Sequence, residues 1–460
     1  MDIEHIFRAY DIRGIVGKNL LPDVILKASA IFANIITEKG GKKVAVGGDI
    51  RISTPSLVYA AMSGIIAAGV DVYLTYPLPI PVFCNFIWQN KNIHGGAFIT
   101  ASHNPPQYNG VRFRRGDGTG FSHENIEIKK RFFKNRIKFV GWADYGTSDT
   151  IQNEEVIDMY LEFIASRIPK PDRSIRVIID GKHGAANLVS LKLFAQYGHE
   201  TIALNSIIDG TFPTGIPDPL HGDVSQIKNL MITTKAPIGI AYDGDGDRAA
   251  FFDEKGRLVP SEIIGLFLAE NLLKANDVIV YNTMCSSMLR RRAEEMGFKT
   301  VECRVGDVFM AEATKIHNAK LGIEESYHFF LPIFGFHYDD AIMASIIVTN
   351  LLASMEKSLA KIHDYYGPIF TIRQNIQVDD KVKFEIIEKF KKWATSEYSD
   401  VSTIDGVKIY LENGSFLARP SNTEPLIRIV ADGECKDIAE EILRKFTKKL
   451  KEIITNFSKG

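Results

Sequence analysis

The chain has 460 residues, too many for one ordinary hydrophobic core, so we expect about three or four domains. Apolar residues make up 45% and charged residues 24% of the chain, as in a typical soluble globular protein. The 55 Lys and Arg residues nearly balance the 56 Asp and Glu residues. This argues against a nucleic-acid-binding protein, because such a surface leaves a basic excess.

The cysteines and the apolar stretches exclude further classes. The four cysteines have no paired CxxC spacing, which argues against a zinc site and a disulfide framework. The chain begins MDIEHIFRAYDIRG, without the basic start and apolar run of a secretion signal. Its longest apolar stretch, from Ala341 to Met355, has about 15 residues, fewer than the roughly 20 that cross a bilayer. We therefore expect a cytoplasmic protein with no membrane partner.

The first 150 residues alternate short Val- and Ile-rich runs with segments of helical period, which is typical of α/β layers. Strands are predicted at 42–49, 69–75 and 95–102. Between the first two, a helix is predicted to begin at Ser53, whose hydroxyl would cap its first turn. The polar stretch 141–153 indicates a domain boundary.

Two further α/β blocks follow, and the last part of the chain has a different pattern. After Tyr366, short strands that read as a small sheet of hairpins precede one long amphipathic helix. These patterns predict three α/β domains and one α+β domain, with boundaries at 1–148, 149–254, 255–366 and 367–460.

The first chemical motif is TASHNPPQYNG, in which a predicted strand ends at Ser102. The Asn, Pro and Gly residues that follow favour a fixed, exposed loop. A serine needs activation to act as a nucleophile, and His103 lies next to it as a possible donor to an anion. An ordinary turn whose polar groups cap their own backbone would fit this motif alone equally well.

The second motif is DGDGDR, where Asp243, Asp245 and Asp247 alternate with glycine. Three carboxylates at this spacing can fold around one hard cation. An EF-hand calcium loop is rejected because Arg248 stands where that loop requires glycine and because strands, not helices, are predicted on both sides. Arg248 beside three Asp residues instead indicates a metal and a guanidinium that share one phosphate.

The third motif is GIEESYHFF, which we interpret as an extended segment. Glu324, Ser326 and His328 then alternate and project to one side, where they would suit sugar hydroxyls. A half-exposed strand with polar residues facing water remains the alternative.

The fourth motif, RPSNTEPLIRI, places a guanidinium, hydroxyls and turn amides in one loop, a plausible phosphate clamp. Its polar residues are Arg419, Ser421, Asn422 and Thr423. Near the start of the chain, Tyr10 and Arg13 in FRAYDIRG could add another phosphate donor.

Together the four motifs resemble the α-D-phosphohexomutase family, over essentially the whole chain and in the family's order. TASHNP and DGDGDR carry the resemblance most specifically, and YDIRG is similar to the phosphomannomutase/phosphoglucomutase branch. The resemblance implies three α/β domains of related topology with mixed sheets, followed by a TATA-binding-protein-like α+β domain, around a central cleft. It also implies an enzyme that interconverts hexose 1-phosphates and hexose 6-phosphates of mannose or glucose through a phosphoserine.

The resemblance assigns roles residue by residue. It implies that Ser102 is the phosphoserine and that Mg²⁺ is bound by Asp243, Asp245, Asp247 and the Ser102 phosphate. Residues near the transfer site would be Tyr10, Arg13, His103, Arg112 and Arg248. Sugar hydroxyls would contact Glu324, Ser326 and His328, and the idle phosphate would contact Arg419, Ser421, Asn422 and Thr423. A bisphosphorylated hexose would serve as intermediate and activator, and we expect a monomer or a homodimer.

Three positions depart from the family pattern. Arg112 stands where lysine is common, and arginine is a poor proton acceptor, so the general base stays open. Ile323 and Tyr327 replace glycines of the usual GGEESGH string, and the Tyr327 ring could narrow a sugar pocket. The segments NTMCSS and RVGD look partly like the phosphoglucosamine mutase branch. Phosphoglucosamine mutase, a catalytically impaired sugar-phosphate-binding protein and a phosphatase are therefore the alternatives.

Overall fold

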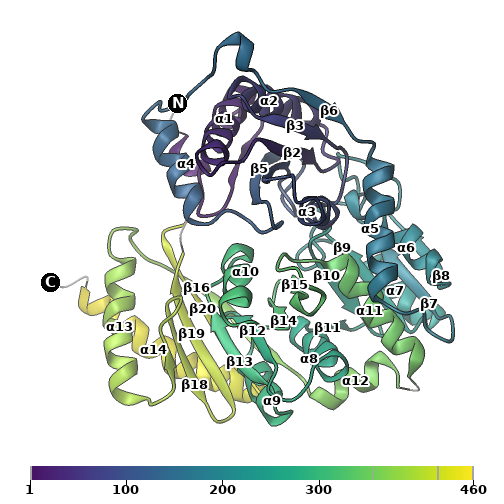
Figure 1. Ribbon diagram of the computed structural model, residues 1–460. Coiled ribbons are helices and arrows are strands. Elements are labelled where there is room, and N and C mark those ends of the chain that lie inside the picture. The colour runs from purple at the N-terminus through teal and green to yellow at the C-terminus, as the bar shows by residue number, and fades with distance from the viewer. Residues whose placement is uncertain (1–2, 356, 422–423, 458–460) are drawn as a thin grey trace. The chain divides into compact units, whose positions relative to one another are not determined.

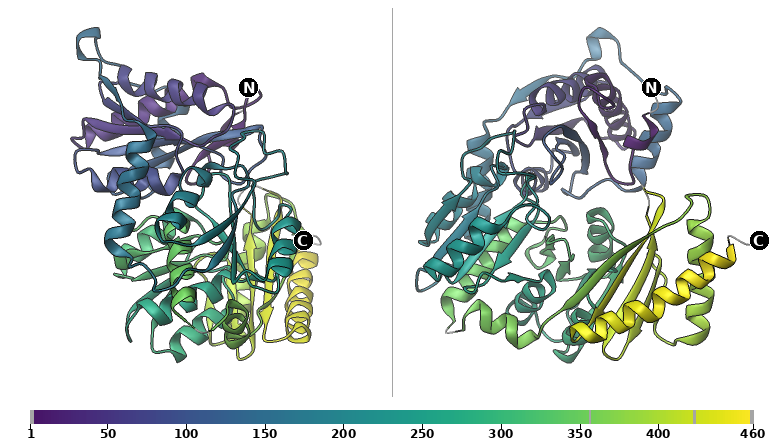
Figure 2. Two further views of the ribbon diagram at one scale, coloured as in Figure 1. Left: turned by 90° about the vertical axis from the view of Figure 1, so that its right-hand side faces the viewer. Right: turned by 180° about the vertical axis from the view of Figure 1, so that it is seen from behind.

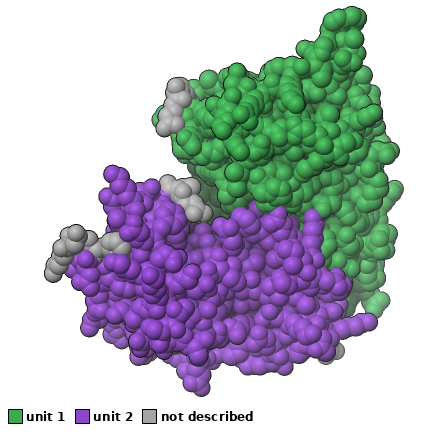
Figure 3. Space-filling model, turned by 60° about the vertical axis from the view of Figure 1, so that its left-hand side comes forward, with its two compact units in different colours: residues 1–259, 326–360 green, residues 260–325, 361–460 purple. Residues whose placement is uncertain are grey.

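The computed structural model describes residues 3–355, 357–421 and 424–457, which form two compact units (Figures 1 and 3). Unit 1 comprises residues 1–259 and 326–360, and unit 2 comprises residues 260–325 and 361–460. The predicted Asn422 and Thr423 lie outside the described residues.

The first sheet of unit 1 has the strand order β1-β5-β4-β2-β3-β6. Strands β2, β3, β4 and β6 are parallel, whereas β5 runs antiparallel to β4 and β1. Helices α1, α2 and α4 lie on one side of the sheet and α3 on the other (Figure 1). Phe32 of α1 stacks on Phe113 of β5, with ring centroids 4.7 Å apart, inside a continuous apolar core. The bounds are β1 Ile12–Ile15, α1 Pro22–Glu38, β2 Lys43–Gly48, α2 Thr54–Ala67, β3 Asp71–Leu74, α3 Ile80–Gln89, β4 Gly95–Ile99, β5 Tyr108–Arg115, α4 His123–Phe133 and β6 Ser148–Thr150.

The second sheet of unit 1 has the order β11-β10-β9-β7-β8. Its strands β7, β8 and β9 are parallel, and β10 forms antiparallel pairs with β9 and β11. The apolar stretch near 341–355 forms helix α11, which is almost wholly buried. The bounds are α5 Asn153–Arg167, β7 Arg176–Asp180, α6 Ser190–Gln196, β8 Glu200–Leu204, α7 Ser225–Thr234, β9 Ile238–Tyr242, β10 Ala249–Phe252, β11 Leu258–Val259, β15 Phe329–Phe330 and α11 Ala341–Ser354.

Unit 2 contains the parallel strands β13, β12 and β14 and a C-terminal antiparallel sheet in the order β16-β20-β19-β18-β17. Helices α13 and α14 cover one face of the antiparallel sheet (Figure 2). The bounds are α8 Ser261–Leu272, β12 Val278–Asn282, α9 Ser287–Glu295, β13 Lys299–Cys303, α10 Asp307–Ile316, β14 Leu321–Ile323, α12 Leu359–Tyr366, β16 Phe370–Gln377, α13 Lys383–Glu397, β17 Val401–Ser402, β18 Val407–Leu411, β19 Gly414–Pro420, β20 Leu426–Gly433 and α14 Lys436–Phe457. Helix α12 begins at the end of unit 1.

The three α/β blocks repeat one strand arrangement. In each block the first parallel strand lies in the middle, with the second strand on one side and the third on the other: β3-β2-β4, β8-β7-β9 and β13-β12-β14. The fold prediction of three related α/β domains and a C-terminal α+β domain is confirmed.

Two local features bear on the sequence-based expectations. Helix α2 follows Ser53, but the Ser53 hydroxyl does not cap it; it accepts a hydrogen bond from Asn109 Nδ2 at 2.9 Å instead. The predicted cap is wrong because a side chain distant in sequence takes this hydroxyl. Among the described helices, none alone is long and apolar enough to span a membrane, although α11 and α12 reach that length and apolarity when joined across their bend.

Glu124 of α4 ties three segments of unit 1 together. It is 4% exposed and accepts hydrogen bonds from Arg115 on β5 and from Lys39 at the end of α1. Burial opposes ionisation, but the bonds from Arg115 and Lys39 outweigh it and lower the pKa of Glu124 to about 2. The ionised form is therefore stabilised in the folded state.

Replacing Glu124 with glutamine should lower the free energy of unfolding by about 2 kcal/mol at neutral pH, the usual value of a hydrogen bond to a charged group. The folded-state pKa is below the ordinary 4.5, so this contribution is complete above pH 4.5 and is lost as pH falls toward 2. Urea unfolding of both proteins across this range should show the difference shrinking with acid. Glu127→Gln, at a more exposed carboxylate on the same helix, is the control; a gap independent of pH would contradict the assignment.

Candidate active site

Ser102 lies three residues beyond the end of β4, in a tight turn. Its backbone has φ +48°, a left-handed conformation that fixes the direction of the side chain. Its Oγ donates a hydrogen bond to Asp243 Oδ2 at 2.7 Å and lies 3.1 Å from His103 Nδ1. The residue is 3% exposed, so the predicted exposed hydroxyl is in fact enclosed by the acidic loop.

The acidic loop connects β9 and β10, which form an antiparallel hairpin. A Cβ atom at Gly244 would lie 2.4 Å from the carbonyl oxygen of Ser102, and Gly246 has φ +80°. Gly244 therefore allows the loop to approach the serine turn closely, and Gly246 allows the left-handed turn within the loop. Carboxylate oxygens of Asp243, Asp245 and Asp247 lie within 4.8 Å of one another, and all three residues are buried.

The electrostatics of these carboxylates fit a hard divalent cation. Burial and the neighbouring carboxylates raise the pKa of Asp243 well above its usual value, and burial and Asp247 raise the pKa of Asp245 to about 6. Burial also opposes ionisation of Asp247, but His328 and Arg112 lower its pKa well below the usual range. Asp245 Oδ1 is buried and has no hydrogen-bond partner within the described parts of the chain. An all-oxygen set of three carboxylates, two of which are disfavoured as anions without a cation, is what Mg²⁺ prefers.

Several cationic groups surround this cluster. Arg112 Nη1 of β5 lies 2.7 Å from Asp247 Oδ2 and 4.0 Å from Asp245 Oδ2. His328 Nε2 lies 3.3 Å from Arg248 Nε and 3.3 Å from Asp247 Oδ1, between a guanidinium and a carboxylate. The positive charge of Arg248 and burial lower the pKa of His103 well below its usual value, which leaves its ring neutral at pH 7.

Arg13, near the start of the chain, contacts the loop that carries Ser102. Arg13 of β1 donates to Ala101 O at 3.2 Å and to Asn104 Oδ1 at 2.7 Å, and pairs with Asp11 at 2.8 Å. Tyr10 lies in the bend before β1 and is half-buried. Arg13 thus contacts the serine loop on both sides of Ser102 in the sequence, at Ala101 and Asn104.

The third motif is a turn, not the extended segment expected. The chain leaves β14 at Ile323, turns at 325–327, and enters β15 at Phe329, with Tyr327 at φ +68°. The expected one-sided alternation is wrong because this left-handed residue reverses the chain. Ser326 Oγ and His328 Nδ1 are 2.9 Å apart. Glu324 belongs to unit 2, where its Oε1 accepts hydrogen bonds from Asn282 Nδ2 at 2.8 Å and from Gly306 N at 3.2 Å.

The fourth motif lies in unit 2. Arg419 is on β19, and its Nη1 lies 3.4 Å from Asp405 Oδ2 in the loop between β17 and β18. The buried Arg419 Nε has no hydrogen-bond partner among the described residues. Ser421 follows the strand and accepts a hydrogen bond from Glu424 N at 3.2 Å. A guanidinium with an unsatisfied buried donor suits an incoming anion.

Comparison with known proteins agrees with this geometry. Four models of the phosphoglucomutase/phosphomannomutase family match the chain: domain I at 4–138, domain II at 158–256, domain III at 260–367 and the C-terminal domain at 374–449. A probable phosphoglucosamine mutase of Methanopyrus kandleri is 30% identical over 445 residues, 96% of each chain. The chain belongs to the α-D-phosphohexomutase family.

Other phosphohexomutases are similar over nearly their full lengths. A phosphoglucomutase/phosphomannomutase of Thermococcus kodakarensis is 30% identical, with 98% of this chain and 99% of the relative covered. A crystal structure of a phosphoglucomutase/phosphomannomutase family protein from Burkholderia thailandensis superposes with a TM-score of 0.89 at 28% identity, covering 97% of this chain and 98% of the other. The chain therefore shares the fold of these relatives and covers nearly their full lengths.

Tyr327 occupies a position where the phosphohexomutase motif has glycine, and its positive φ explains that glycine. The Tyr327 side chain is buried, and its hydroxyl donates to Val259 O of β11 at 2.8 Å. The ring thus anchors the turn to the second sheet.

Tyr327→Phe should lower the free energy of unfolding by about 1 kcal/mol, because the Val259 carbonyl loses its donor. Thermal unfolding measures this, with Tyr145→Phe at an exposed site as the control. Equal melting temperatures for Tyr327→Phe and the unmodified protein would show that the bond does not anchor the turn.

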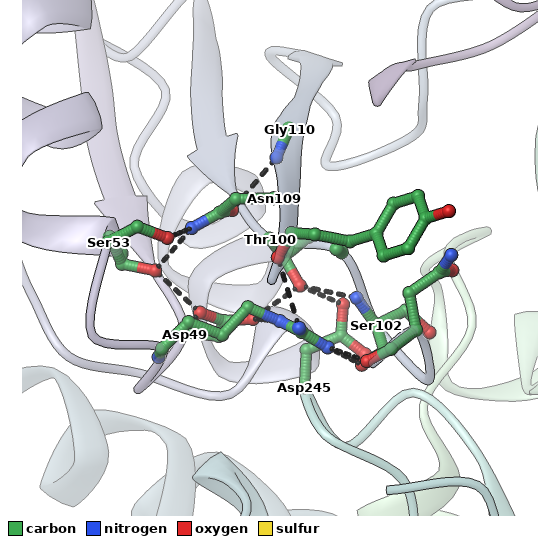
Figure 4. A network of polar contacts seen from close by, with 12 residues as sticks. Asp49, Ser53, Thr100, Ser102, Asn109, Gly110 and Asp245 are labelled. Carbon is green, nitrogen blue, oxygen red and sulfur yellow. Dashed lines mark hydrogen bonds and ion pairs between the residues drawn. The ribbon is translucent and has the colours of Figure 1, made fainter. Parts of the chain in front are cut away.

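Sequence reasoning missed three residues that surround the serine loop: Asp49, Arg51 and Thr100 (Figure 4). A signal was present, because Asp49 and Arg51 directly follow buried strand β2, and parallel β4 ends beside it. Carboxyl ends of adjacent parallel strands commonly form ligand sites.

Proposed function

We propose that this protein is a Mg²⁺-dependent phosphohexomutase that interconverts the 1- and 6-phosphates of mannose and glucose. The observation that carries the proposal is the 2.7 Å hydrogen bond from Ser102 Oγ to Asp243 Oδ2, inside a group of three buried carboxylates. A serine oxygen and the ligands of a hard cation then share one small volume. Phosphoryl transfer depends on this juxtaposition of acceptor atom and charge neutralisation.

The residues around Ser102 suit the two half-reactions. Asp243, Asp245 and Asp247 would hold Mg²⁺, which would neutralise charge on the phosphoryl oxygens. In the forward half-reaction the Oγ–P bond of phosphorylated Ser102 breaks, a bond from phosphorus to a sugar hydroxyl oxygen forms, and the proton of that hydroxyl passes to Ser102 Oγ. In the return half-reaction the Oγ–P bond forms and the bond from phosphorus to the sugar oxygen breaks. The proton of Ser102 Oγ, which is donated to Asp243 Oδ2 in the resting protein, passes to that sugar oxygen. Arg248 would stabilise the moving charge.

One serine must address both ends of the sugar, so the bisphosphorylated intermediate must turn end for end. Arg419 and Ser421, with Asn422 and Thr423, would bind whichever phosphate is not reacting. Glu324 and Ser326 would bind hydroxyls in both orientations.

Phosphoglucosamine is the second candidate substrate. The two segments that resemble the phosphoglucosamine mutase branch both contact Glu324, through Asn282 and through Gly306 N. The residues that hold Glu324, which we propose binds sugar hydroxyls, thus belong to the segments that resemble phosphoglucosamine mutases. Phosphoglucosamine mutase of Methanocaldococcus jannaschii is 31% identical over 461 residues.

The test combines mass spectrometry with a substrate panel. The purified protein, incubated with Mg²⁺ and glucose 1,6-bisphosphate, should gain the mass of one phosphoryl group on the peptide containing Ser102. Turnover of the 1-phosphates of glucose, mannose and glucosamine then ranks the substrates. Saturable binding without turnover would identify an impaired binding protein, and sustained phosphate release without isomer formation would identify a phosphatase.

A further inference from the structure

The hydroxyl of Thr100 lies at a junction between the serine loop and the acidic hairpin (Figure 4). Thr100 Oγ1 accepts a hydrogen bond from Ser102 N at 2.8 Å. The same oxygen lies 2.8 Å from Asp245 Oδ2 and 2.8 Å from Asp49 Oδ2. A hydroxyl carries one proton, so at any moment Thr100 can donate fully to only one of these two carboxylates.

Asp49 is the anchor of a guanidinium that holds the serine loop. Arg51 Nε donates to Asp49 Oδ2 at 3.1 Å, while Arg51 N and Thr54 Oγ1 donate to Asp49 Oδ1 at 3.0 and 2.7 Å. Arg51 and Asp49 are both fully buried. The orientation of the guanidinium is therefore set by Asp49.

The remaining donors of Arg51 bind backbone carbonyls of the serine loop. Its Nη2 donates to Ser102 O at 2.6 Å and to Asn104 O at 2.7 Å. Its Nη1 donates to Pro105 O at 2.8 Å and to Tyr108 O at 3.1 Å. One rigid, planar group thus fixes four carbonyls around the left-handed Ser102.

We infer that Thr100, Asp49 and Arg51 form a positioning relay that couples cation binding at Asp245 to the geometry of the Ser102 loop. In the metal-free protein the Thr100 hydroxyl is shared between the two carboxylates. A divalent cation on Asp245 makes that carboxylate a weaker acceptor, so the hydroxyl then donates its hydrogen bond to Asp49. This stronger bond favours both cation binding and the loop position that Arg51 holds. The inference rests on the proposed roles of Ser102 and of the three aspartates.

The relay is distinguished from a purely structural role by its effect on Mg²⁺ affinity. Buried hydrogen bonds that only support the fold change stability and leave the metal affinity alone. Partners that orient a metal ligand typically change metal affinity by about 10- to 100-fold when removed. Mg²⁺ affinity of the unphosphorylated protein is therefore the decisive readout, and it requires no turnover.

The first test is Thr100→Val, which keeps the shape and removes the hydroxyl. Calorimetric titration with Mg²⁺ should show a dissociation constant about 10-fold higher than that of the unmodified protein. In the mutase assay kcat should fall about 10-fold or more, with KM within about 3-fold, because loop geometry and not sugar binding is affected. Thr100→Ser should restore both values to within about 3-fold.

Thr349→Val is the matched control, a buried threonine of α11 whose hydroxyl bonds Ser345 O. It should leave Mg²⁺ affinity unchanged. Asp49→Asn provides a second variant should Thr100→Val fail to fold. It removes the negative charge that receives the Thr100 proton and should weaken Mg²⁺ binding at least about 3-fold.

Unchanged Mg²⁺ affinity in folded Thr100→Val, or in Asp49→Asn if that is the variant that folds, would overturn the relay. The proposed function fails separately: an unmodified protein that binds no Mg²⁺, or a Ser102→Ala protein with full mutase activity, would remove it whatever the Thr100 variants do.

Discussion

Ser102→Ala should lose mutase turnover by at least about 10⁴-fold, because a covalent route has no substitute for the oxygen that carries the phosphoryl group. The loss should appear in kcat on every sugar of the panel. The variant should also fail to incorporate phosphate from a hexose bisphosphate. Coupled assays of isomer formation and intact-protein mass spectrometry measure the two effects.

The same variant should retain its metal site. Ser102 Oγ donates to Asp243, and the three carboxylates remain without it, so Mg²⁺ should bind with an affinity close to that of the unmodified protein. Ser166→Ala, which removes a hydroxyl bonded within α5, is the control and should keep full turnover. Wild-type turnover by Ser102→Ala would refute the phosphoserine mechanism.

The sequence could predict those parts of the site whose residues lie close together along the chain. Asp243, Asp245 and Asp247 lie in one hairpin, so their spacing with glycine is enough to indicate a metal loop. The α/β pattern also predicted the fold, because the parallel strands of each α/β block alternate with helices along the chain.

The parts that sequence could not predict depend on contacts between distant segments or on unusual backbone angles. Thr100 and Asp49 are 51 residues apart, and only the pairing of β2 with β4 brings them together. The period-two pattern at 324–328 suggested a strand, but the positive φ of Tyr327 makes a turn. No pattern of residue types reveals that angle at a tyrosine. The predicted helix cap at Ser53 was wrong because of a contact between distant segments: the Ser53 hydroxyl accepts a hydrogen bond from Asn109 of β5.

Asp245→Asn should raise the stability of the metal-free protein and lower its affinity for Mg²⁺. Asp245 Oδ1 makes no hydrogen bond to any residue that the structure describes, and burial together with Asp247 raises the pKa of Asp245 to about 6. The charge of Asp245 therefore opposes folding when no cation is present. An amide of the same shape removes that repulsion. In the presence of EDTA, the variant should therefore melt a few degrees above the unmodified protein at pH 8.

The gain should disappear when Mg²⁺ is added. A neutral amide is a weaker ligand than a carboxylate, so Mg²⁺ affinity should fall about 100-fold and turnover should fall with it. Excess Mg²⁺ should then stabilise the unmodified protein and have little effect on the variant, which reverses their order of melting temperatures. Asp209→Asn, at a half-buried carboxylate of unit 1, should change neither the Mg²⁺ affinity nor the order of melting temperatures.

A variant that melts lower than the unmodified protein in EDTA would mean that the repulsion is already compensated by Arg112, whose Nη1 lies 4.0 Å from Asp245 Oδ2. Retained Mg²⁺ affinity would instead mean that Asp243 and Asp247 hold the cation without Asp245. The melting temperature in EDTA and the Mg²⁺ affinity together therefore show whether the charge of Asp245 destabilises the fold and whether it binds the metal.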